Sequence, residues 1–192
     1  MFRKVIVAGL LGGLVLFGWT FVINGLFGFR NSLDMNQIPA EREVYEILRE
    51  SIVKPGRYVC NPELTSLGTF PDGEPVFSIH FSGMGHESAG RLMVFQLALF
   101  FVAPTIGAWT LSVSSARILA SYHRRVLFFA AVGLLLATYG VLQNFGIDGY
   151  SLGDTLMLAG RDVISWTLVG LAVAWGIQPE SSPVMRSQAA RA

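Results

Sequence analysis

The chain is poor in charge and in cysteine. Only 14% of its 192 residues are charged, whereas 52% are hydrophobic, and this balance does not suit the surface of a water-soluble protein. Cys60 is the one cysteine, so an internal disulfide is excluded. Its thiol could be free, buried as a small apolar group, or bridged to another chain, and the buried state is the favoured expectation.

Recognisable catalytic and nucleic-acid-binding patterns are also lacking. The three histidines are not accompanied by a nucleophile and an orienting acid in a known arrangement, and no glycine loop of the phosphate-binding type occurs. The basic residues do not gather into a nucleic-acid patch. We therefore expect no enzymatic activity, no cofactor and no nucleic-acid partner.

Long apolar runs dominate what is present, at residues 5–29, 92–113, 126–142 and 163–177. The hydrocarbon core of a bilayer is about 30 Å thick and takes roughly 20 helical residues. The first three runs have about this length, and the fourth reaches it if its helix begins upstream of Val163. The sequence predicts an all-α membrane protein, a bundle of four transmembrane helices.

The distribution of charge predicts an orientation. With both termini in the cytoplasm, the short inner segments carry half of the fourteen basic residues and one of the thirteen acids, Glu180. These inner basic residues are Arg3, Lys4, Arg117, Arg124, Arg125, Arg186 and Arg191. Lysine and arginine concentrate on the cytoplasmic side of membrane proteins, so both termini are expected there. The basic residues between the second and third runs suit anionic lipid headgroups.

Four segments follow from this topology. Residues 1–30 form a short cytoplasmic N-terminus and the first helix, which is too long for a cleaved signal and is expected to stay as an anchor. Residues 31–90 form an extracytoplasmic cap, and residues 91–178 hold helices two to four. Residues 179–192 are a cytoplasmic tail that we expect to be disordered.

The cap has predictable elements of its own. Val44, Ile47, Leu48 and Ile52 recur at helical spacing, which predicts an amphipathic helix from about Pro39 to Ile52, with Pro39 in its first turn. Short strands are expected at residues 57–60 and 76–81, and apolar alternation in the second predicts one buried face. The cap is expected to be a small α+β unit that packs on the membrane bundle.

Metal binding in the cap is a weak alternative. His80, His86 and Cys60 are ligand types that copper or zinc accepts. No spacing places two of them on one face, so the sequence predicts no metal site.

Two features of the spans concern packing. Gly9 and Gly13 form a G-x-x-x-G pair, which lets a neighbouring helix of this chain or of another protein approach closely. Pro104 leaves the carbonyl of Phe100 without its intrahelical donor, which predicts a kink in the second span.

Polar residues of the spans gather at the external end. By rise per residue, Asn24, Gln96, Gln143, Asn144, Arg161 and Asp162 all lie near that boundary. A charge at the depth of Arg161 is costly unless it is paired or its side chain reaches the surface, and the favoured partner is Asp162 or an acid of the cap. One interpretation is a hydrated outward-facing vestibule for a small polar ligand; the favoured one is contact with headgroups and attachment of the cap.

Several short patterns resemble a group of uncharacterised bacterial four-helix inner-membrane proteins. Their external segment has Pro-Asn-Glu-x-x-Val-x-x-x-Leu and Pro-Gly-x-Tyr, to which Pro39, Glu41, Val44, Leu48 and Pro55 to Tyr58 are similar. Ala40 replaces the asparagine, and residues 71–85 form a longer insert. The last two spans are similar as well, at Arg125 to Phe128, Tyr150 to Thr155 and Asp162 to Ala174. The resemblance implies an inner-membrane location and this topology, and no site residue.

The sequence thus favours a non-catalytic accessory, structural or assembly subunit of a membrane complex. Its expected partners are the lipid bilayer and either another membrane protein or further copies of itself. The alternative is a protein that binds or transports a small molecule or metal ion in the vestibule.

Overall fold

A computed structural model describes residues 2–34, 36, 38–145 and 150–178. The chain divides into two compact units, one of residues 1–34 with 94–192 and the other of residues 35–93. Each unit is described by itself. The expected tail at residues 179–192 lies outside the described residues.

The first unit is helical. Its elements are α1 (Phe2–Thr20), the π-helix η1 (Phe21–Leu26), α2 (Phe29–Asp34), α4 (His86–Ser112, from Val94 on), α5 (Ala116–Leu119), α6 (Tyr122–Leu136), the π-helix η2 (Ala137–Val141), the 3₁₀ turn η3 (Leu142–Asn144) and α7 (Leu152–Gly176). Four helical stretches are long and apolar enough to cross a membrane: Phe2–Leu26, Leu92–Ser112, Tyr122–Val141 and Leu152–Gly176. The prediction of four membrane-length helices is confirmed, including the upstream start of the fourth.

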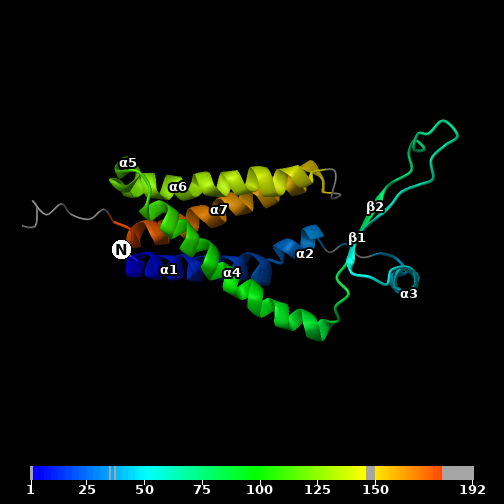
Figure 1. Cartoon of the computed structure of the whole chain (residues 1–192), viewed down its shortest axis with the longest axis horizontal. Helices are drawn as coiled ribbons and strands as arrows, with labels where there is room; N and C mark the ends of the chain where they lie inside the picture. Colours follow the sequence, from blue (N-terminus) through cyan, green and yellow to red (C-terminus); the bar gives the residue numbers. More distant parts are fainter. Residues whose placement is uncertain (1, 35, 37, 146–149, 179–192) are drawn as a thin grey trace, which may run out of the picture. The chain divides into compact units, whose positions relative to one another are not determined.

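Helix α7 is the centre of this unit. It packs against α1 on one side and α6 on another, and α4 crosses the group obliquely (Figure 1). Ser151 begins α7 as its N-cap, since its hydroxyl oxygen accepts the amide of Asp154 at 3.1 Å and donates to the Asp154 carboxylate at 2.7 Å. This cap satisfies one of the backbone amides at the start of α7 that have no intrahelical acceptor.

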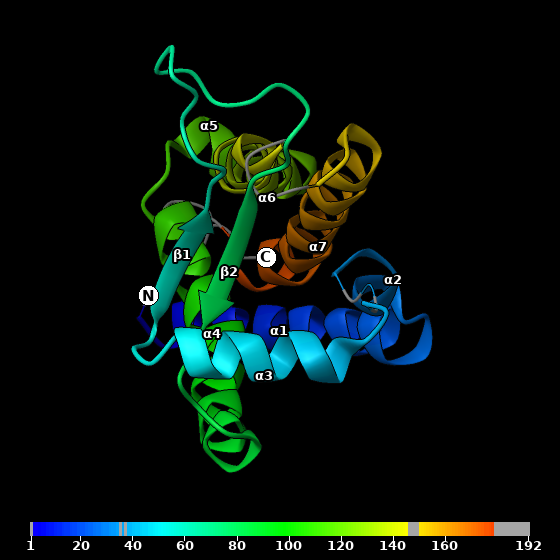
Figure 2. The ribbon, with the colours of Figure 1, turned by 90° about the vertical axis from the view of Figure 1, so that its right-hand side faces the viewer.

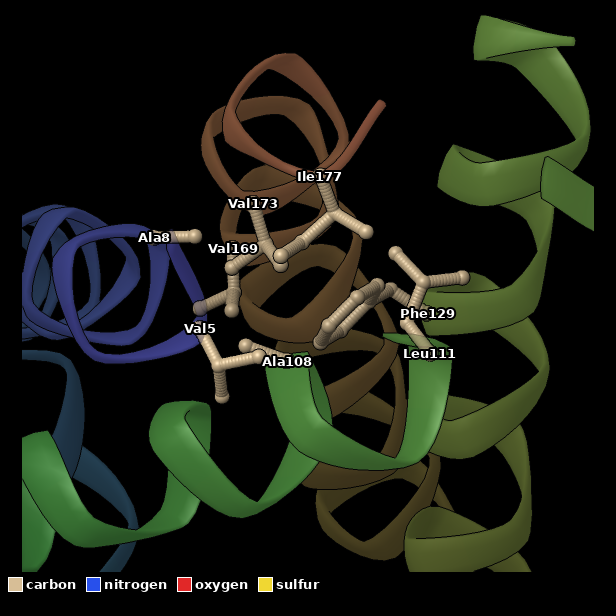
Figure 3. Packing of buried hydrophobic residues seen from close by; sticks show 8 residues of the cluster. All are labelled: Val5, Ala8, Ala108, Leu111, Phe129, Val169, Val173 and Ile177. Carbon is tan, nitrogen blue, oxygen red and sulfur yellow. The ribbon is translucent and has the colours of Figure 1, made fainter. Parts of the chain in front are cut away.

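The apolar core joins residues of α1, α4, α6 and α7 with Ile177, as Figure 3 shows. Phe129 of this core is fully buried, and its ring stacks on that of Trp166 with the ring centroids 6.2 Å apart. Two glycines make room for its side chain. A Cβ on Gly107 would lie 2.8 Å from the Phe129 ring, and one on Gly170 would lie 2.6 Å from Phe129 Cβ.

Gly9 and Gly13 lie at the contact between α1 and α4. A Cβ on Gly9 would come within 2.5 Å of Thr105 Cα, and one on Gly13 would lie 2.9 Å from the carbonyl oxygen of Phe100. That oxygen is the one released by Pro104, and α4 continues as a helix through this proline. The helix that faces the glycine pair therefore belongs to this chain.

Arg125 differs from its expected place at a lipid surface. The side chain is buried, its Nε donates to the carbonyl of Ala174 at 3.1 Å, and its Nη1 donates to that of Leu119. Ala174 lies in the last turn of α7, where the carbonyls have no intrahelical donor, so the guanidinium satisfies one of them and interacts favourably with the helix dipole. The neighbouring Arg117 and Arg124 stay exposed.

The second unit contains α3 (Glu41–Ser51) and two antiparallel strands, β1 (Gly56–Cys60) and β2 (Phe77–Phe81). The two strands lie side by side in Figure 2. These elements match the predicted helix and strands. Helix α3 starts two residues later than expected, after Pro39, because Ala40 is left-handed with φ 61° and the helix cannot extend back through it.

Two expectations of burial in this unit are wrong. In β2 only Ile79 is half-buried, whereas Phe77 and Phe81 are exposed, because a two-stranded ribbon has few neighbours to cover its face. Cys60 is an exposed free thiol rather than a buried one for the same reason.

Candidate functional site

A polar cavity of about 240 Å³ lies within the helical unit. It is bounded by residues of α1, η1, α2, α4 and α7: Leu16, Thr20, Ile23, Asn24, Arg30, Phe100, Arg161, Asp162, Ser165 and Trp166. Ligand pockets for drug-sized molecules are commonly about 300 to 1,000 Å³. The space therefore suits a small polar group or several water molecules.

A change of helix type places Asn24 on the cavity wall. After Thr20 the helix widens into the π-helix η1, in which the amide of Phe27 donates to the carbonyl of Val22 at 3.2 Å. Gly28 then takes a left-handed conformation, φ 59°, and α2 begins with Arg30 in its first turn. This turn of the chain sets Arg30 on the same cavity as Asn24. Single π-turns inside membrane-length helices often occur at functional positions.

Helix α7 contributes the charged pair. Both Nε and Nη2 of Arg161 donate to Oδ1 of Asp162, at 3.0 and 2.7 Å, and each side chain is 25% exposed. Both bonds use the same carboxylate oxygen. The other oxygen, Asp162 Oδ2, makes no hydrogen bond with any described residue. The same holds for Arg161 Nη1. Of the two pairings that the sequence allowed, the structure has the one with Asp162.

Asn24 carries an unsatisfied acceptor. Its Oδ1 is buried, and the described part of the chain supplies no hydrogen-bond donor to it. Leaving such an acceptor without a donor costs about 1 to 3 kcal/mol. A group that donates a hydrogen bond into the cavity would recover that cost.

The predicted outer polar residues are only partly brought together. Asn24, Arg161 and Asp162 share the cavity, whereas Gln96 is exposed on α4 and is not among the lining residues. The side chain of Asn144 lies outside the described residues.

Residues that the sequence did not single out complete the wall. Arg30 looked like an ordinary flanking residue, and Ser165 like a small residue of an apolar run. Ser165 donates to the carbonyl of Arg161 at 2.7 Å and accepts from the indole nitrogen of Trp19 at 3.0 Å, which ties α1 to α7. The i, i+4 spacing of Arg161 and Ser165 on α7 is the signal that could have found it.

The metal candidates are not gathered. In the register of the strand pair Cys60 faces Phe77 and His80 faces Arg57, so they are three positions apart and on opposite faces of the ribbon. The side chain of His86 lies outside the described residues. Among described residues no three His, Cys, Asp or Glu side chains gather where they could hold a metal ion.

Ser151 lies within a short pattern that is typical of serine hydrolases. Residues 149–153 match the G-x-S-x-G sequence of a nucleophile elbow. Ser151 has φ −66° and ψ 160°, an ordinary extended conformation, and its hydroxyl is engaged in the cap of α7. The only histidine of the helical unit, His123, lies in the first turn of α6, far along the chain from this cap. Ser151 therefore acts as a helix cap.

The cavity presents hydrogen-bond acceptors, guanidinium donors and an aromatic wall. Comparison of the chain with protein-family models, with curated proteins and with solved structures finds no match.

Proposed function

We propose that this protein is a non-catalytic accessory or assembly subunit of a membrane complex in the bacterial inner membrane, with both termini in the cytoplasm. The observation that carries the proposal is the N-terminal half of the second membrane-length helix. Every residue from 94 to 99 is exposed, among them Val94 at 70% and Phe95 at 63%. A helix apolar on all sides is normally covered by lipid or by other helices.

Gln96 favours a protein over lipid as the cover. It is an exposed amide about one turn inside the span that begins at Leu92, and a polar side chain below the headgroups is costly against hydrocarbon. Amide side chains of membrane helices satisfy their groups across helix contacts. The occupant of this surface is therefore a transmembrane helix of a partner protein.

Crosslinking in cells tests the proposal. A photoreactive amino acid at Phe95 or Leu99 is expected to trap one protein in good yield, and the Gln96→Leu variant should reduce that yield severalfold. Leu135 on α6 is the matched control position, because it is 67% exposed and apolar. It should give no defined product.

Two results would overturn the proposal. A product composed of two copies of this chain would make it a homo-oligomer without a separate partner. Equal, diffuse products from Phe95 and Leu135 would mean that lipid alone covers α4.

A further inference from the structure

The cavity lined by Asn24, Arg30, Arg161 and Asp162 has no part in the proposed contact of α4, yet it presents two chemically distinct sets of groups. The first set accepts hydrogen bonds. Asn24 Oδ1 is buried without a donor among the described residues, and Asp162 Oδ2 is left over from the ion pair with Arg161. An ammonium group offers N–H donors to both, and the carboxylate makes such bonds charge-assisted.

The second set donates. Arg161 keeps Nη1 for a further acceptor, and Arg30 is among the residues that line the same cavity. Planar guanidinium groups bind carboxylate and phosphate oxygens in preference to neutral acceptors. An acidic group is the natural ligand for this side.

Neither charge alone suits the cavity. A simple anion leaves the acceptor of Asn24 without a donor, and a simple cation leaves Arg161 Nη1 without an acceptor. A molecule that carries both charges satisfies both sets, and Ile23, Phe100 and Trp166 offer an apolar wall to a short hydrocarbon linker between them.

We propose that this cavity binds a small zwitterion, an ammonium and an acid group joined by a short linker. Two sources share this chemistry: the phosphoethanolamine headgroup of a lipid, and a free molecule such as a small amino acid. The volume of about 240 Å³ holds the charged group and excludes large side chains.

A comparison of headgroups tests the lipid source. The purified full-length protein is placed in bilayer discs of phosphatidylethanolamine or of phosphatidylcholine, and retained lipid is counted by native mass spectrometry. The choline headgroup has the same phosphate but no N–H donor, so it cannot satisfy Asn24. Retention of the ethanolamine lipid is expected to exceed that of the choline lipid at least tenfold.

The free source is tested in detergent without ethanolamine lipids. Phosphoethanolamine, glycine and inorganic phosphate are titrated while the unfolding temperature is recorded. A zwitterion should raise this temperature in a saturable way, and phosphate alone should raise it less.

Asn24→Leu is the decisive variant. It removes a buried acceptor without a donor, so the protein should fold at least as well as the parent, whereas selectivity for the ethanolamine lipid or the shift by a free zwitterion should be lost. Gln143→Leu is the matched control, since it removes an exposed amide outside the cavity and should keep binding intact.

Selective lipid retention or a saturable shift by a free zwitterion, lost in Asn24→Leu and kept in Gln143→Leu, supports the proposal and identifies the source. Equal retention of both lipids with no shift overturns it. So does an equal shift by phosphate alone, or selectivity that survives Asn24→Leu.

Discussion

Gly9 has no room for a side chain, because Thr105 of α4 occupies the space where a Cβ would stand. The obstacle includes backbone, with Thr105 Cα at 2.5 Å, so a rotamer change cannot relieve it. We expect Gly9→Ala to lower the free energy of unfolding by about 1 to 3 kcal/mol, the usual cost of overpacking. Thermal unfolding of the purified protein in detergent measures the change.

Gly18→Ala is the control for that experiment. Gly18 lies on the same helix with nothing within 4 Å of its potential Cβ, so alanine should be neutral or should stabilise by up to about 1 kcal/mol. If both substitutions had the same effect, contact of Gly9 with Thr105 would not explain the change, and the close approach of α1 and α4 would be wrong.

The close approach at Gly9 and Gly13 was open to sequence reasoning because a four-residue spacing of glycines has a direct geometric meaning. The identity of the partner helix could not be predicted, since a G-x-x-x-G pair does not specify which helix packs against it. The unsatisfied acceptor of Asn24 could not be predicted from the sequence either. Its amide was expected at the external end, but only the π-turn of η1 and the bend at Gly28 set it on a cavity with Arg30.

At the scale of elements, Arg125 joins the start of α6 to the end of α7. Its guanidinium satisfies the carbonyls of Ala174 and Leu119, and hydrogen bonds that involve a charged group contribute about 1.5 to 3 kcal/mol each. We expect Arg125→Ala to lower the free energy of unfolding by at least that amount. Arg125→Lys should restore part of it, because an ammonium can reach one carbonyl but lacks the planar fork.

Arg124→Ala separates this role from a loss of positive charge. Arg124 is exposed and donates to the carbonyl of Arg117 at 3.0 Å, so its removal should change stability by no more than about 0.5 kcal/mol. Equal losses for the two alanine variants, measured by unfolding in detergent, would contradict the capping role of Arg125.

Elements with a strong internal pattern were predictable. The four long helices follow from apolar length, and α3 from its helical spacing. The exposure of β2 was not predictable, because apolar alternation predicts a buried face only where another layer exists to cover it. The burial of Arg125 was also not predictable, because a cluster of basic residues between two spans is typical of a lipid-facing loop. Only the position of α7 beside this loop shows that one arginine turns inward.

At the scale of the whole molecule, the predicted charge asymmetry can be tested with the single cysteine. Cys60 is an exposed free thiol in the unit of residues 35–93, which is expected outside the cytoplasm. A membrane-impermeant maleimide should therefore modify the full-length protein in intact spheroplasts of a bacterial host, as read by a mass shift on a gel.

The matched variant is Cys60→Ser with Ser115→Cys. Ser115 is exposed in the connection between α4 and α5, which the distribution of arginines places in the cytoplasm. This thiol should react only after the membrane is permeabilised, because the bilayer separates it from the reagent. Reaction of Ser115→Cys in intact spheroplasts, with Cys60 protected, would reverse the orientation and place the polar cavity at the opposite side of the membrane. Reaction of both thiols before permeabilisation would contradict a membrane-spanning arrangement of the four helices.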